Sequence, residues 1–114
     1  MINELITKIF KERNNSHASH WSTSSYAQHQ ALGEFYGGIV EILDKYVEAY
    51  IGTFGKLEDI PDDVDNISQV VRANLIWLNE NRSELSKEVP ALENILDELA
   101  GLHMTTLFKL ENLR

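Results

Sequence analysis

Residues 17–55 read HASHWSTSSYAQHQALGEFYGGIVEILDKYVEAYIGTFG. From Tyr26 onward, apolar or aromatic side chains recur every three or four residues, which predicts one long helix over about residues 25–54. A second apolar set with the same period lies between Leu32 and Tyr50. A helix with two apolar faces has to be covered on both sides. In so small a chain one face can pack inside the subunit and the other against a second copy, so we expect a homo-oligomer, at least a dimer.

The same periodicity extends to both sides of this stretch. The predicted helices cover about residues 2–21, 25–54, 66–83 and 90–113. No alternating pattern typical of a strand is present, and no internal repeat. The sequence therefore predicts an all-α protein in which residues 1–114 form a single four-helix-bundle domain.

The predicted connections contain residues that favour helix ends. Ser24 or Ser25 is expected to cap the long helix, and Gly55 to end it before one long connection. Asp65 or Asn66 is expected to cap the third helix.

A polar turn over residues 83–89 and Pro90 at the first position of the last helix complete the predicted chain. Because the long connection has only about twelve residues, an up-down-up-down order of helices and a ferritin-type crossover both stay open.

Composition restricts the partners. Eighteen acidic and ten basic residues give a net charge of −8, which repels a phosphate backbone, so we expect no nucleic-acid partner. The absence of cysteine excludes disulfides and thiolate chemistry. No apolar run reaches the ~20 residues of a membrane span and no secretory signal is evident, so we expect no membrane partner and a cytoplasmic location.

Two groups of metal-ligating side chains lie on the predicted long helix or next to it. His20 and His29 flank the short turn, which brings them to the same end of the bundle. Asp44 and Glu48 are one helical turn apart and share a face. About 22 Å of helix separates His29 from Asp44, so one subunit cannot bring them to one ion. A second copy packed antiparallel about a two-fold axis could do so and would create two symmetric sites.

Other polar features have simpler interpretations. His103 lies on an apolar stripe and is expected to be a hydrogen-bonded histidine of the protein interior, while His17 is expected at the surface. Gly33 and Gly37 lie on the face of His29, where missing side chains permit either the close approach of another helix or a ligand cavity. No Glu-x-x-His, HExxH or Ser-His-Asp pattern is present, so hydrolase chemistry has no support.

Residues 5–55 resemble the Dps miniferritins of the ferritin-like superfamily. The resemblance rests on His20-Trp21, His29, the pair Asp44 and Glu48, and their spacing. It implies a ferritin-like bundle that binds iron between two-fold-related subunits through His20, His29, Asp44 and Glu48, possessing at most a reduced ferroxidase activity. The reduction follows because Gly33 stands where that family has an aspartate ligand, and the interval from His20 to His29 is shorter.

The whole chain also resembles a family of small uncharacterised proteins of tailed phages, which implies an origin in an infected host cell. No activity can be inferred from that resemblance. An alternative hypothesis is therefore a non-enzymatic oligomeric protein that uses the bundle, and the glycine gap beside His29 and Tyr36, to capture a host protein or a small signalling molecule. A plain structural component of the virion is a third hypothesis.

Overall fold

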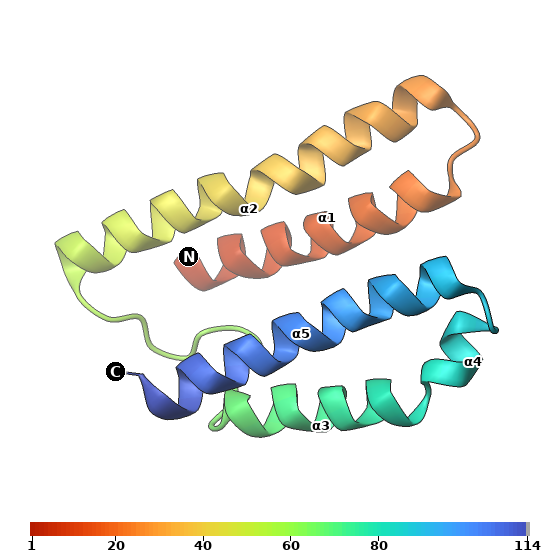
Figure 1. The fold of residues 1–114 in the computed structure, drawn as a ribbon. Coiled ribbons are helices and arrows are strands. Elements are labelled where there is room, and N and C mark those ends of the chain that lie inside the picture. Colours follow the sequence, from red (N-terminus) through yellow and green to blue (C-terminus); the bar gives the residue numbers. More distant parts are fainter. Residues whose placement is uncertain (114) are drawn as a thin grey trace. The chain divides into compact units, whose positions relative to one another are not determined.

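The computed structural model describes residues 1–113, and the regular secondary structure within them is helical, with no strand (Figure 1). Its five helices are α1 (Ile2–Ser22), α2 (Tyr26–Phe54), α3 (Ile67–Glu80), α4 (Arg82–Ser86) and α5 (Pro90–Asn112). The predicted all-α class is confirmed, and three of the four predicted helices are observed within one or two residues of their predicted ends. The chain divides into two compact units, which meet between Asp63 and Val64 in the sequence.

The predicted caps are present in the structure. The hydroxyl oxygen of Ser25 accepts a hydrogen bond from the backbone N–H of Gln28 at 3.2 Å, and Asn66 caps α3 through Gln69 in the same way. Gly55 ends α2 with a φ of 92°, which glycine adopts without a steric penalty. Pro90 begins α5, as its fixed φ favours.

The predicted end of the third helix, at residue 83, is wrong. α3 ends at Glu80, and the polar turn that we predicted from residue 83 is instead the short helix α4 as far as Ser86. Asn81 causes the break: its side-chain amide donates to the carbonyl of Trp77 at 2.7 Å and its backbone N–H is shared between two carbonyls of the last turn. Asparagine side chains can replace backbone hydrogen bonds of a helix in this way. The spacing of apolar residues does not reveal where this happens.

The first unit is an antiparallel hairpin of α1 and α2, visible at one side of Figure 1. Ile6 and Leu43 are its buried apolar side chains, with 3% and 7% of their surface exposed. Asn3 donates to the carbonyls of Glu58 and Asp59, which ties the connection that follows α2 back to the start of α1. The hairpin thus places the turn at residues 23–25 at one end and this tether at the other.

The second unit consists of α3, α4 and α5 (Figure 1). Its buried apolar side chains are Leu78, Ala100 and Leu107. The guanidinium of Arg82 donates to Glu93 at 2.9 Å and to Asp97, which fastens α4 to α5. These hydrogen bonds, to Asp97 first and Glu93 second, raise the pKa of Arg82.

Both units leave long apolar faces exposed. On α2 these are the side chains of Phe35, Ile42 and Tyr46, and on α5 those of Ile95 and Leu102, each between 44% and 68% exposed. We predicted a four-helix bundle that forms a single domain. The structure describes each unit by itself, so both statements stay predictions.

Candidate functional site

The structure brings His20 and His29 together across the turn between α1 and α2. Their imidazole rings stack with centroids 3.6 Å apart and planes 18° from parallel. Nδ1 of His20 is 2.6 Å from the carbonyl oxygen of His29, and Nδ1 of His29 is 2.8 Å from the carbonyl oxygen of His20. Each ring therefore reaches across to the backbone of the other, an arrangement that we call the histidine clasp.

The clasp determines that Nδ1 of each ring carries a proton. A carbonyl oxygen can only accept, so Nδ1 of each histidine must carry the proton that it donates. In a neutral imidazole the lone pair is then on Nε2. A backbone carbonyl on Nδ1 is the usual partner of a histidine whose Nε2 binds a metal, because it orients the ring and selects the tautomer.

An aromatic cluster extends the clasp along the hairpin. His17 stacks on Tyr36 at 3.9 Å and 13°, and lies 4.1 Å from Trp21 between ring centroids. The edge of His20 meets Tyr36 at 5.3 Å, and the guanidinium of Arg13 lies 5.6 Å from the centre of the Tyr36 ring. Tyr36 thus contacts both halves of the cluster and holds α1 against α2 at this end.

His17 is a half-buried member of this cluster rather than a plain surface residue. Desolvation lowers its pKa below the ordinary 6.5, and the charges of Arg13 and His20 lower it further. The folded protein therefore favours neutral His17. Sequence spacing does not reveal the stack of His17 on Tyr36, because that contact depends on how α2 lies against α1.

Gly33 is explained by the clasp. A β-carbon at this position would lie 3.1 Å from Cε1 and 3.3 Å from Nδ1 of His20, closer than side-chain atoms normally approach. The imidazole of His20 fills the space that a side chain at residue 33 would need. Gly33 therefore leaves room for the ring of His20 and also lines an open hollow beside that ring, whereas a β-carbon on Gly37 would have no neighbour within 4 Å.

Asp44 and Glu48 lie on α2 away from the clasp, and both are exposed. Among residues 1–113 no three histidine or carboxylate side chains are grouped closely enough to hold a metal ion. The shared site of His20, His29, Asp44 and Glu48 stays a prediction, because one chain separates the two pairs by about 22 Å of helix. His103 donates from Nδ1 to the carbonyl of Leu99 at 2.8 Å, one turn back on α5.

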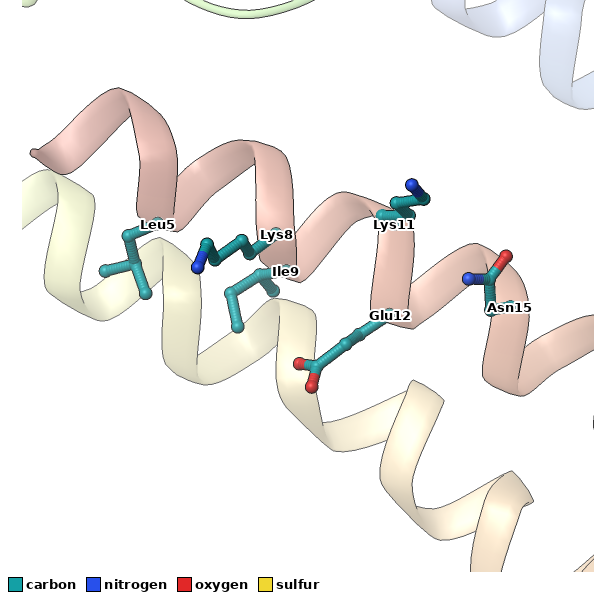
Figure 2. A pocket seen from close by; sticks show the side chains of 6 residues that line it. All are labelled: Leu5, Lys8, Ile9, Lys11, Glu12 and Asn15. Carbon is teal, nitrogen blue, oxygen red and sulfur yellow. The ribbon is translucent and has the colours of Figure 1, made fainter.

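Several open hollows lie on the first unit, and two of them have volumes near 500 Å³. One, of about 500 Å³, is lined by His20, Tyr26, His29, Gln30, Gly33 and Glu34 and so adjoins the clasp. The other, of about 480 Å³, follows α1 alone. Figure 2 shows Ile9 and Glu12 reaching from it toward α2 while Lys11 points away, so its polar groups do not converge on one point. The hollow beside the clasp is the better candidate site.

Comparisons with known proteins agree with the phage resemblance. The family described as "Family of unknown function (DUF5856)" matches residues 20–110. An uncharacterised 14.6 kDa protein of Enterobacteria phage T4, from the mobD-ri intergenic region, is 28% identical over 92 residues, or 75% of this chain and 69% of that protein. No solved structure matches. Neither the family description nor the phage relative names Dps or ferritin.

The helices of the structure also bear on the membrane prediction. Within residues 1–113 none combines the length and the apolar character that crossing a bilayer requires.

Proposed function

The chain belongs to DUF5856, a family of unknown function, and we propose that it is a homo-oligomeric, ferritin-like protein that binds a divalent transition metal between two-fold-related subunits. Iron is the first metal to test. In the four-helix bundle that we propose, the exposed apolar side chains of α2 and those of α5 would be covered, because extended apolar faces are rarely left to water. The phage relative makes the cytoplasm of an infected cell the expected location.

The histidine clasp is the observation that carries this proposal. His20 and His29 each use Nδ1 on a backbone carbonyl, so both keep Nε2 as an acceptor, at the edge of an open hollow. Imidazole nitrogens suit iron, zinc and other late transition metals. A clasp of this kind orients the ligands before the ion arrives, which reduces the cost of binding.

The second half of the site would come from another subunit. Asp44 and Glu48 of that subunit would supply hard oxygen ligands, which complement the imidazoles. The geometry of the chain supports a shared site, because its own carboxylate pair lies about 22 Å along α2 from His29.

Catalysis by this site would be weak. Gly33 offers no carboxylate, and a β-carbon at this position would lie 3.1 Å from the ring of His20. A ferroxidase that loses a ligand keeps at most a reduced activity, so metal binding, with iron oxidation secondary, is the function proposed here. Bound iron would supply the redox chemistry, and the chain would contribute ligands and their orientation.

Metal titration of the full chain tests the proposal. We expect wild type to bind Zn²⁺ or, without oxygen, Fe²⁺ with defined stoichiometry, and His29→Ala to bind at least about tenfold more weakly. His103→Ala is the matched control, because His103 donates from Nδ1 in the same way but lies on α5. Equal binding by wild type and His29→Ala would contradict the proposal.

Mixing two inactive variants tests whether the site is shared. His29→Ala lacks one half of each site and Asp44→Asn/Glu48→Gln lacks the other half. A mixed dimer contains one site with both halves intact, so mixing should restore up to half of the binding capacity. Failure to restore binding would show that the two pairs do not act together across subunits.

The hollow beside the clasp favours a second candidate function, that of a non-enzymatic binding protein. Tyr26 and Trp21 are each 73% exposed at this end of the hairpin, and Gln30 donates to the hydroxyl of Tyr26 at 2.8 Å. Exposed aromatic residues beside polar groups are typical of sites that recognise a protein or a small ligand. Recovery of a defined host protein or nucleotide with wild type, but not with Trp21→Ala, would support this alternative.

A further inference from the structure

The hollow beside the histidine clasp differs in charge from the two polar hollows along α1. Lys8 lines both of those hollows, whereas no lysine or arginine among residues 1–113 lines this one. Glu34, on its wall, is exposed, and none of the ion pairs within residues 1–113 involves its carboxylate. The hollow therefore carries one negative charge that the chain does not compensate.

Most free hydrogen-bonding groups of this hollow are acceptors. The clasp leaves a lone pair on Nε2 of both His20 and His29 when the rings are neutral. Gln30 donates one N–H to the hydroxyl of Tyr26 at 2.8 Å, which leaves its side-chain carbonyl to accept and its second N–H to donate. The carboxylate of Glu34 adds two more acceptor atoms. A ligand that satisfies these groups has to bring several N–H donors and a positive charge.

The ring of Tyr26 favours a planar cation. It is exposed at the wall of the hollow, and the hydrogen bond from Gln30, one turn along α2, restrains it. The face of an aromatic ring attracts a cation electrostatically. A guanidinium is flat, so it can stack on such a ring while its five N–H donors point outward in its own plane. An ammonium has three donors and no plane to stack.

The charges around the hollow permit such a ligand. Arg13 is the cation of the aromatic cluster, and its guanidinium lies 5.6 Å from the centre of the Tyr36 ring rather than on the wall of the hollow. It also donates to the side-chain oxygen of Asn14. The chain as a whole has a net charge of −8, which attracts cations and repels anions.

We propose that the hollow beside the clasp binds a guanidinium group. Glu34 and Nε2 of His20 and His29 accept its N–H donors, and the ring of Tyr26 covers one of its faces. The proposal names the ligand class of the second candidate function, so it rests on that function and is independent of the metal. Two sources share this chemistry, a small molecule and an arginine side chain of a protein.

An NMR titration of the ¹⁵N-labelled full chain, with EDTA present, tests the proposal. One probe is N-acetyl-arginine amide. The matched probe is N-acetyl-citrulline amide, in which a neutral urea group replaces the guanidinium. We expect the arginine probe to shift amide signals of residues 20–34 and to bind at least about fivefold more tightly than the citrulline probe. Added salt should weaken this binding, because the carboxylate is exposed.

Two variants of the hollow and one control complete the test. Glu34→Gln keeps the size of the side chain and removes its charge, so it should bind the arginine probe at least about threefold more weakly than wild type. Glu41→Gln is the matched control, because Glu41 is also an exposed glutamate of α2 but does not line the hollow. Tyr26→Leu should also bind more weakly, since it removes the aromatic face. Far-UV circular dichroism checks that each variant folds.

A capped Gly-Arg-Gly peptide distinguishes the two sources. Tighter binding of the peptide than of N-acetyl-arginine amide would indicate a protein segment, because groups that flank the arginine could then contact Trp21, which is exposed at the same end of the hairpin. Equal binding would indicate a small molecule.

Three results would overturn the proposal: equal binding of the arginine and citrulline probes, binding by Glu34→Gln as tight as that of wild type, or amide shifts confined to another surface. The metal function fails separately, because EDTA removes divalent metals. A protein that binds Zn²⁺ but not the arginine probe would refute this proposal alone. Recovery of a partner through Trp21, by a protein that does not bind the arginine probe, would refute the ligand class and leave the second candidate function in place.

Discussion

Replacing Gly33 by alanine tests whether the histidine clasp holds the first unit together. The new β-carbon would lie 3.1 Å from His20, so the ring must move away from the carbonyl of His29. Loss of that hydrogen bond costs about 1 kcal/mol, and a weaker ring stack costs ~0.5–1.5 kcal/mol more. Alanine regains ~1 kcal/mol of helix stability, so we expect net destabilisation of about 0.5–1.5 kcal/mol.

Gly52→Ala is the control for this substitution. It has open space around the new methyl group, so it should stabilise the protein by ~1 kcal/mol. The two alanine variants should therefore differ by about 1.5–2.5 kcal/mol in the free energy of unfolding, the sum of the clasp terms above. Urea unfolding followed by Trp21 fluorescence in a Trp77→Phe background measures this for the first unit. Equal stabilisation by both alanines would refute the reasoning, because the clasp would then tolerate a β-carbon at residue 33.

Three further predictions concern a pH dependence, a cap and an ion pair. The lowered pKa of His17 means that the unfolded chain takes up a proton near pH 6.5 while the folded chain does not, so stability should be constant above that pH and decline as the pH falls below it. Trp21 fluorescence at graded pH checks this, and His17→Gln should show a flatter decline. Ser25→Ala should destabilise the protein by ~1 kcal/mol in urea unfolding, whereas Ser24→Ala, at a position that caps nothing, should have little effect. Arg82→Gln should lower the hydrogen-exchange protection of α4, because Glu93 and Asp97 would lose the guanidinium that joins α4 to α5; unchanged protection would contradict that role.

The sequence was sufficient for local structure. Helix positions follow from apolar spacing, and the ends follow from residues whose side chains or φ angles act within a few positions, such as Ser25 and Gly55. The break after Glu80 was missed because one asparagine amide competes with the helix at Asn81, an effect too local to disturb the periodicity. Contacts between helices, such as the stack of His17 on Tyr36, depend on how the two helices lie against each other, which such patterns do not encode.

Local sequence features also predicted part of the candidate site. A short turn between antiparallel helices was enough to bring His20 and His29 to one end. Their reciprocal hydrogen bonds to backbone carbonyls could not be predicted, because they depend on the rotation and separation of two helices rather than on spacing. The sequence analysis placed Tyr36 beside His29, seven residues earlier on the same face, but the contacts of Tyr36 with His17 and His20 could not be predicted for this reason too.

The meaning of Gly33 changes once the clasp is known. Compared with the Dps pattern, this glycine is simply a missing ligand. In the structure this glycine lies against the clasp, because a β-carbon at residue 33 would be 3.1 Å from the ring of His20 and would push that ring away by a few tenths of an ångström. A side chain at residue 33 therefore competes with the reciprocal histidine pair for the same space. In the metal site that we propose, the oriented pair of imidazoles would stand where a Dps protein has an additional oxygen ligand, which would favour holding a metal over oxidising it.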